Sequence, residues 1–423
     1  MDAPTLLFAY GLLCALLSLN ALRPLYRPSP VAALSFFPGW LVAELALHHV
    51  WLQCVVGALL VGWGGLRGPV GWAGFGLLAA SELLLVVVWT RGRAAGPAVE
   101  AALREGLGAG WRSEIPEEVA ARLPTAVEPR RWLLPFWRRR SGVEVQRGLE
   151  FARLDDGTVL RLDLFRPRTR PRNCPVLVFA HGGGWVIGFK EHQGLPMLYN
   201  LAAQGWLCAS VDYRLSPRAT FPDHLVDVKR ALAWVRGPGV EHGADPSFVV
   251  VCGNSAGGHL AALAALTPND PAYQPGFEGA DTSVAGCVGL YGVYDFVDRD
   301  RLWPHRDGLW LVRRVVLKTT PERDPELYAR ASPLSQVRAD APPFLLVHGT
   351  LDGLAPVAGG RAFAKALREV STNPVVWVEI PGGQHAFEVF HSPRADHALL
   401  GVFGFLAWLR GRRPGETPPR PAG

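Results

Sequence analysis

The segment Val249–Leu266 has the sequence VVVCGNSAGGHLAALAAL, and this stretch decides how the surrounding chain folds. Its first residues are apolar and β-branched, as in a buried strand, and its last are rich in alanine and leucine, as in a helix. Gly253 and Gly257 enclose Ser255 at the junction. In such a G-x-S-x-G turn the serine occupies a sharp, strained bend at the start of the helix, where the dipole favours developing negative charge. The segment therefore predicts a nucleophilic serine at the end of a strand.

Short apolar runs alternate with helical patterns on both sides of this segment. The runs PPFLLVHGT (342–350) and PVVWVEI (374–380) are strand-like, whereas residues 221–236 repeat apolar side chains on one helical face. Two alternating runs around Asp156-Gly157 predict a hairpin. Buried strands that alternate with helices form a mostly parallel sheet with helices on both faces. We expect this α/β fold to cover residues 143–411.

A serine hydroxyl needs a base, and the base needs an orienting acid. Asp352 and His385 follow two of the predicted strands, in the order Ser, Asp, His that this kind of fold uses. We expect His385 to accept the Ser255 proton and Asp352 to hold the imidazole. Asp295 is the alternative acid. The other histidines in this part of the chain are weaker candidates for the base: His259, which we expect to pack in the core, His391 and His397.

The glycine-rich run HGGGW (181–185) also follows a predicted strand. Its backbone N–H groups are suited to bind the oxyanion of a tetrahedral intermediate. The expected donors are Gly183, Gly184 and Ala256, the last being the residue after the nucleophile. We expect His181 to brace this loop and expect two aromatic side chains to line the substrate pocket, Trp185 and Tyr213.

Taken in order along the chain, five motifs resemble the hormone-sensitive-lipase-type branch of the α/β-hydrolases: HGGGW (181–185), DYRLSP (212–217), GNSAGG (253–258), HGTLDGLAP (348–356) and HAF (385–387). The resemblance covers residues 145–411 and implies cofactor-independent hydrolysis of carboxylic esters. It assigns the catalytic roles to Ser255, Asp352 and His385. Asn254 departs from the branch, in which aspartate is often found, and the acid motif is closer to esterases acting on small or feruloyl esters. Together with the apolar N-terminus, the chain resembles bacterial membrane-associated esterases.

Residues 1–92 are the most apolar part of the chain. Three runs have the length and composition of transmembrane helices, namely Ala3–Leu22, Gly39–Leu60 and Val70–Thr90. A signal peptide is the alternative for the first run, but it lacks a clear basic start and cleavage site. Pro38-Gly39 indicates that residues 31–38 lie at the interface. We therefore expect a multi-pass membrane protein.

Four glutamate or histidine residues lie inside these runs: Glu44, His48, His49 and Glu82. Glu44 and His48 are four residues apart and would share one helix face. A proton or metal site is one interpretation of that pair, because intramembrane carboxylates are costly. A polar contact that packs the small bundle is the other, and the sequence does not decide between them.

Arginines set the expected orientation. Arg23 and Arg27 flank the first loop, and only Arg67 lies in the second, which predicts that the catalytic part faces the cytoplasm. The segment 93–142 contains RRWLLPFWRRR (130–140), in which aromatic and basic residues interleave. That pattern is found in nucleic-acid binders, but after apolar spans it is typical of anchoring at lipid headgroups. We therefore expect membrane lipid, and no nucleic acid, as a partner, and we expect residues 412–423 to be disordered.

None of the six cysteines forms a CxxC pair or a metal-ligand spacing, so they indicate no metal site. That no cofactor is needed is what the family resemblance implies. The function that fits best is a membrane-associated serine carboxylesterase or lipase acting on a small-molecule or lipid ester. A peptidase or amidase with the same residues, and a non-catalytic membrane protein that kept the fold, are the alternatives. We expect the cap over the site to come from residues after Thr90 and from Arg299–Arg330.

Overall fold

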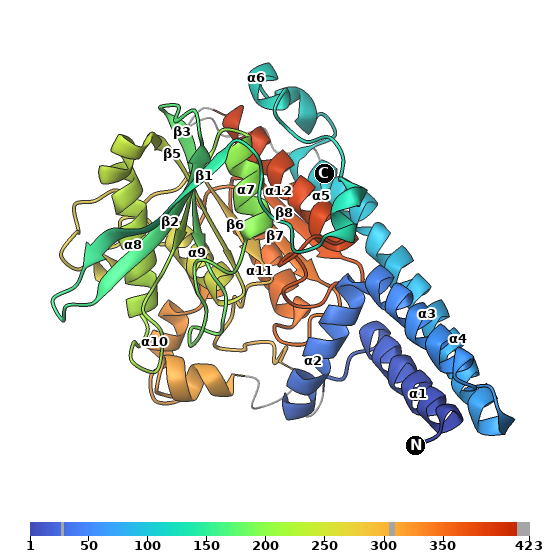
Figure 1. Cartoon of the computed structure of the whole chain (residues 1–423). Helices are drawn as coiled ribbons and strands as arrows, with labels where there is room; N and C mark the ends of the chain where they lie inside the picture. Colours follow the sequence, from blue (N-terminus) through green and yellow to red (C-terminus); the bar gives the residue numbers. More distant parts are fainter. Residues whose placement is uncertain (27–28, 304–308, 413–423) are drawn as a thin grey trace.

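The computed structural model describes residues 1–26, 29–303 and 309–412; the predicted disordered tail lies almost wholly outside these ranges. Its centre is an eight-stranded sheet with the order β1-β2-β4-β3-β5-β6-β7-β8 (Figure 1). The strands are β1 (Val143–Arg153), β2 (Val159–Pro167), β3 (Cys174–Ala180), β4 (Leu207–Val211), β5 (Ala244–Asn254), β6 (Gly286–Leu290), β7 (Phe344–Gly349) and β8 (Val375–Ile380).

The sheet is mostly parallel, as predicted. β3 pairs in parallel with β4 and β5, and the parallel pairing continues through β6, β7 and β8. β2 is antiparallel to both β1 and β4. The β1–β2 turn contains Gly157 at φ +82°, a conformation that favours glycine, so the predicted hairpin is confirmed. Because the carboxyl ends of parallel strands share one edge, the loops after β5, β7 and β8 lie at the same side of the sheet.

Helices cover both faces of this sheet. Successive residues of β5 enter opposite cores: Val249 and Val251 join one buried cluster, while Val250 and Cys252 join the other. The first core includes residues of α8 (Asp223–Arg236), α9 (Ala256–Leu266), α10 (Pro325–Arg330) and α11 (Val357–Val370). The second includes residues of α5 (Ala95–Leu107), α7 (Leu195–Ala203) and α12 (Pro393–Arg410).

The position of α5 differs from the sequence prediction. The sequence places residues 93–142 in a linker or cap, whereas Val99 and Leu103 of α5 are buried in the second core. A Cβ on Gly106 would lie 2.8 Å from a methyl group of Val376 in β8, so this helix is tightly packed on the sheet. Only Ala94 separates α5 from the long apolar helix before it. The start of the segment therefore belongs to the catalytic core.

The N-terminal helices are α1 (Ala3–Leu22), α2 (Ser29–Glu44), α3 (Ala46–Gly62) and α4 (Gly68–Arg93). Three of them project away from the sheet, α1, α3 and α4, whereas α2 lies beside the catalytic part (Figure 1). α1 and α4 approach closely, because a Cβ on Gly11 would lie 2.3 Å from the carbonyl oxygen of Gly74. The hydroxyl groups of Ser18 and Ser81 are 2.8 Å apart at the same contact. Two helical segments, 3–22 and 68–107, are long and apolar enough to cross a membrane, and the bent pair α2–α3 makes a third if it is one span.

The second apolar run is not the straight helix that its hydropathy predicts. α2 begins before Pro38 and meets α3 at an angle of 88°. Glu44 ends α2 and His48 lies in α3, so the prediction that they share one helix face is wrong. Glu44 instead pairs with Arg394 of α12 at 3.5 Å, which favours the packing interpretation. Glu82 accepts a hydrogen bond from the thiol of Cys54.

Candidate active site

Ser255 occupies a strained turn between β5 and α9. Its φ of 54° and ψ of −119° are rarely adopted by a residue with a side chain. A Cβ on Gly253 would lie 2.2 Å from the carbonyl oxygen of Gly257. A Cβ on Gly257 would lie 2.0 Å from that of Ala180. Both flanking glycines are therefore required for the close approach of β3, β5 and α9 that presents the serine.

The structure brings the three predicted catalytic residues together. The Ser255 hydroxyl lies 2.8 Å from Nε2 of His385, and Nδ1 of His385 lies 2.7 Å from Oδ2 of Asp352. The other carboxylate oxygen accepts hydrogen bonds from the N–H groups of Leu354 and Ala355. Ser255 follows β5, Asp352 follows β7 and His385 follows β8, and the carboxyl ends of these strands meet at one edge of the sheet. One continuous hydrogen-bond chain therefore connects hydroxyl, imidazole and carboxylate.

Asp352 is fully surrounded by protein yet remains a carboxylate. Burial alone would raise the pKa of Asp352, but the interactions with His385 and His348 outweigh burial and hold it well below its usual value. Nε2 of His348 lies 3.2 Å from Oδ2 of Asp352, the oxygen that also contacts His385. The same nitrogen lies within hydrogen-bond distance of the Ala355 carbonyl. His348 escaped the sequence analysis, although its position four residues before Asp352 was a signal that could have found it.

The glycine loop after β3 lies beside the serine. A Cβ on Gly182 would be 3.0 Å from the Cβ of Ser255. The Gly182 N–H donates to the side chain of Gln193. Among the hydrogen bonds described for this region, none is donated by the N–H groups of Gly183, Gly184 or Ala256. These are the three predicted oxyanion donors, and they remain free to bind an oxygen atom.

The two predicted pocket residues are buried, Trp185 at the end of this loop and Tyr213 after β4. Trp185 is 4% exposed, and its indole N–H donates to Nδ1 of His259 at 3.2 Å. Tyr213 is 3% exposed, and its hydroxyl donates to the carbonyl of His181 while the two rings stack. Their burial favours a bracing role over that of a pocket wall. His259 contacts the carbonyl of Ala331 and is buried in the core, as expected. Nδ1 of His181 lies 2.8 Å from the carbonyl oxygen of Gly182, which agrees with the expected bracing of the loop.

The alternative acid and bases lie in other networks. Asp295 accepts the N–H groups of Val297 and Arg299 and so shapes its own loop. His391 pairs with Asp396 at 2.7 Å, and the imidazole of His397 packs against Gly96. None of the contacts described for these residues reaches Ser255. The geometry therefore favours Asp352 and His385 over the alternatives.

A second buried network lies directly behind the imidazole. The Tyr291 hydroxyl donates to Glu388, and the Asn254 amide donates to both Tyr291 (2.9 Å) and Glu388 (3.1 Å). The Tyr291 ring lies edge-on to His385, with 4.5 Å between centroids. Burial raises the pKa of the Glu388 carboxyl. Sequence reasoning missed this network, although Glu388 stands three residues after His385.

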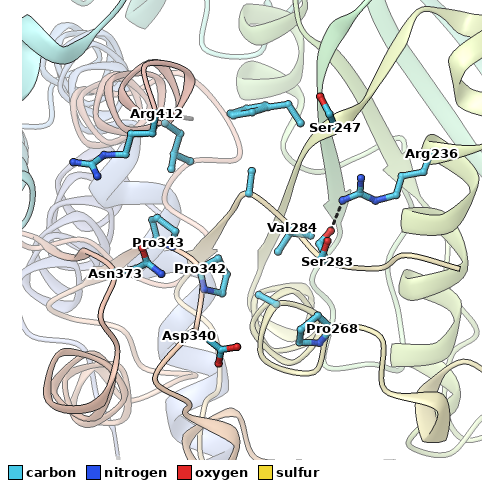
Figure 2. Close-up of a pocket in the computed structure, with 14 residues that line it drawn as sticks. Arg236, Ser247, Pro268, Ser283, Val284, Asp340, Pro342, Pro343, Asn373 and Arg412 are labelled. Carbon is cyan, nitrogen blue, oxygen red and sulfur yellow. Dashed lines mark hydrogen bonds between the residues drawn. The ribbon is translucent and has the colours of Figure 1, made fainter. Parts of the chain in front are cut away.

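Among the described residues, no group of three or more His, Cys, Asp or Glu side chains is arranged to hold a metal ion. A cavity of about 410 Å³ lies at the opposite edge of the sheet, before β6 and β7 (Figure 2). Arg236 and Arg412 border it, but Arg236 donates to the Ser283 carbonyl and Arg412 pairs with Glu114. The cavity is thus remote from Ser255 and its cations are already engaged.

The sheet order, the strained serine after β5 and the acid and histidine after β7 and β8 are those of an α/β-hydrolase. The BD-FAE family model matches residues 162–367. LipM of Mycobacterium tuberculosis, a probable carboxylic ester hydrolase, is 39% identical over 411 residues, which cover 96% of this chain and 93% of LipM. Esterase LipQ of the same organism is 43% identical over 256 residues, or 60% of each chain.

Solved structures agree with these matches. The propionate-bound esterase Est2 of Thermogutta terrifontis is 26% identical, with a TM-score of 0.52 over 62% of this chain and 92% of Est2. A truncated carbohydrate esterase from gut microbiota shares the fold, with a TM-score of 0.55 at 21% identity over 64% of this chain and 99% of its own. The chain therefore belongs to the hormone-sensitive-lipase-type carboxylic ester hydrolases, and it is an enzyme.

Proposed function

We propose that this chain is a membrane-associated serine carboxylesterase in which Ser255 is the nucleophile, His385 the general base and acid, and Asp352 the residue that orients the imidazole. The observation that carries the proposal is the hydrogen-bond chain from the Ser255 hydroxyl through His385 to Asp352. A hydroxyl so placed can lose its proton to Nε2 as it attacks an ester carbonyl.

The proposed reaction has two halves. Ser255 Oγ bonds to the carbonyl carbon, its proton moves to His385, and the oxyanion is bound by the N–H groups of Gly183, Gly184 and Ala256. The tetrahedral intermediate collapses as His385 protonates the departing alcohol, which leaves an acyl-enzyme. Water then attacks the acyl carbon, gives a proton to His385, and releases the carboxylic acid while the proton returns to Ser255.

The apolar N-terminal helices support the membrane part of the proposal. Helices at 3–22 and 68–107 have the length and composition of spans. Large apolar side chains are exposed on α1, α3 and α4, among them Leu16, Leu59 and Leu83. The segment after α5 exposes four more apolar residues between arginines: Leu133, Leu134, Phe136 and Trp137. Such side chains suit the boundary between headgroups and acyl chains. Esters that reside in or near the membrane are the proposed substrates.

The test is hydrolysis of p-nitrophenyl acetate, butyrate, octanoate and palmitate by the full-length protein in detergent, beside Ser255→Ala. We expect the parent to hydrolyse at least one of these esters and the variant to lose nearly all of that activity. An octanoate or palmitate optimum would support a lipid ester, because each buried methylene contributes about 0.8 kcal/mol of binding. Parental rates in Ser255→Ala, or amide turnover faster than ester turnover, would contradict the proposal.

A further inference from the structure

α2 presents two opposite faces. Leu34, Phe37 and Leu41 recur at the spacing of one helix face and are exposed. Phe36 and Ala43, on the other face, are buried, and Trp40 beside them is half-buried. The second face lies against the loop that follows β8 and carries His385. This apolar helix therefore packs onto the catalytic machinery itself.

Three consecutive loop residues contact α2. The indole N–H of Trp40 donates to the carbonyl of Ala386 at 2.9 Å. The Phe36 ring lies edge-on to the His385 imidazole, with 6.1 Å between centroids. A Cβ on Gly39 would lie 3.0 Å from the amide nitrogen of Gln384, so no larger residue fits there without a shift. The Trp40 hydrogen bond thus holds the backbone directly after His385, while Phe36 and Gly39 pack against the side chains of His385 and Gln384.

The Trp40 hydrogen bond acts where the backbone is strained. Ala386 has a φ of +59°, in the left-handed region that non-glycine residues seldom adopt. Such a conformation persists only when its surroundings hold it. The Trp40 indole binds the carbonyl of this residue, the one directly after His385, and its ring packs on Phe390 at 5.2 Å further along the loop.

Arg394 connects α2 to the loop after β8. Its guanidinium is buried and donates to the carbonyls of Pro381, Ala43 and Val88 at 3.0, 3.1 and 2.9 Å. Pro381 begins the loop after β8, while Ala43 lies in the last turn of α2. Arg394, at the start of α12, thus connects α2 to the loop after β8. The hydrogen bond between Trp40 and Ala386 therefore joins two segments that are already held together by a third element.

We propose that Trp40 is a positioning residue for His385: by holding the Ala386 carbonyl it keeps the imidazole aligned with Ser255, so the apolar N-terminal region completes the active site as well as anchoring it. This inference rests on the proposed function. Phe36 assists by covering the edge of the imidazole. Neither residue exchanges a proton with the substrate; both act through the geometry of the histidine.

The test compares Trp40→Phe with Trp51→Phe in the full-length protein, in one detergent. Trp40→Phe keeps an aromatic ring but removes the N–H donor, while Trp51, on α3 and 69% exposed, is the matched control. Active sites are titrated with a fluorophosphonate, and kcat per titrated site and KM are measured with p-nitrophenyl butyrate. We expect kcat per site to fall about three- to tenfold, the worth of one hydrogen bond, with KM unchanged. Trp51→Phe should match the parent.

An unchanged kcat per titrated site in Trp40→Phe would overturn the inference. If the variant only has fewer active sites that react with the fluorophosphonate, and each of them keeps the parental kcat, Trp40 has a purely structural role and the inference is also overturned. Phe36→Leu keeps an apolar side chain and is judged by the same criterion if Trp40→Phe fails to fold. Failure of the proposed function is distinguishable, because then Ser255→Ala would hydrolyse the ester at the parental rate whatever the Trp40 variant does.

Discussion

At the residue scale, Asp352 and Asp295 have very different surroundings although both follow strands of the sheet. Asp352 contacts two imidazoles and two backbone N–H groups, and its pKa lies well below the usual value because of the histidines. Asp295 contacts only the N–H groups of its own loop among the bonds described for it. The sequence leaves open whether Asp352 or Asp295 is the catalytic acid, and substitution of each residue can decide between them because their surroundings differ so much.

Asp352→Asn is expected to lower kcat by about 10⁴-fold, because an amide would favour the wrong imidazole tautomer and would not stabilise the imidazolium. Asp295→Asn, the matched control, should stay within about threefold of the parent. Steady-state hydrolysis of p-nitrophenyl butyrate measures both. The reverse order of the two losses would identify Asp295 as the acid.

Asn254→Asp would place a second carboxylate within reach of Glu388. The Asn254 amide now donates to Glu388 and Tyr291, and an aspartate oxygen could only accept. We expect a destabilisation of about 1–3 kcal/mol that is larger at pH 8 than at pH 5, because both carboxyls ionise as the pH rises. Thermal unfolding at the two pH values measures it. Equal unfolding temperatures of variant and parent at pH 8 would contradict the account of this network.

The residues that sequence reasoning singled out and those that it missed differ in a physical way. Ser255 was predictable because its turn requires glycines at fixed positions, and His385 and Asp352 because they follow apolar strands. Tyr291 carries no local signal and Glu388 only its nearness to His385, since their network forms when the end of β6 and the loop after β8 meet in space. Such contacts depend on tertiary packing, which spacing along one chain does not encode.

At the element scale, the bend between α2 and α3 shows where hydropathy loses its predictive value. The apolar run continues beyond the bend, and Glu44 is the single charged residue at that point, which does not by itself predict a turn. The bend is fixed from outside: Glu44 accepts a hydrogen bond from Ser392 at 2.6 Å and pairs with Arg394, both near the start of α12. The α5 helix escaped prediction for the same reason, because its partner strand β8 lies about 270 residues later in the chain.

Arg394→Met is expected to destabilise the protein by about 3–5 kcal/mol, because it leaves the Glu44 carboxylate buried without its cation and three carbonyls without their donor. Arg104→Met, at an exposed position of α5, should change stability by less than about 0.5 kcal/mol.

Adding Glu44→Gln to Arg394→Met should recover part of the loss, since the second change removes the unpaired charge. Thermal unfolding in one detergent compares the three variants. If Arg394→Met unfolds at the parental temperature, the buried pair is not what joins the N-terminal helices to α12.

At the scale of the whole molecule, two buried histidines make folding sensitive to acid. Burial lowers the pKa of His224 to about 3 and that of His259 to about 3, from the ordinary 6.5. The unfolded chain therefore binds protons that the folded one does not. Their contribution is present above pH 6.5 and is lost as the pH falls toward 3, by up to about 1.4 kcal/mol per pH unit for each histidine.

Thermal unfolding between pH 7 and pH 5 should accordingly show a falling midpoint, and His224→Gln should flatten that slope. His192→Gln serves as the control, because His192 lies at the surface loop after β3 and outside the core. A parental slope in His224→Gln would show that this histidine does not titrate with folding.

The organisation of the molecule follows from its two kinds of apolar surface. Residues in the strands and their covering helices are buried on both faces of one sheet, whereas α1, α3 and α4 keep large apolar side chains exposed. The sequence predicted the sheet because each buried strand is a separate apolar run. It did not predict that α2 and α5 join the catalytic part, which makes the N-terminal region more than an anchor in our proposal.

The measurement that tests the central claim most directly is mass spectrometry of the full-length protein after reaction with a fluorophosphonate. We predict one adduct per chain, on the peptide that contains Ser255, and its loss in Ser255→Ala; His385→Ala should slow its formation by at least about 10³-fold. An adduct on another residue, or parental labelling of the chain in Ser255→Ala, would contradict the assignment of Ser255 as the nucleophile.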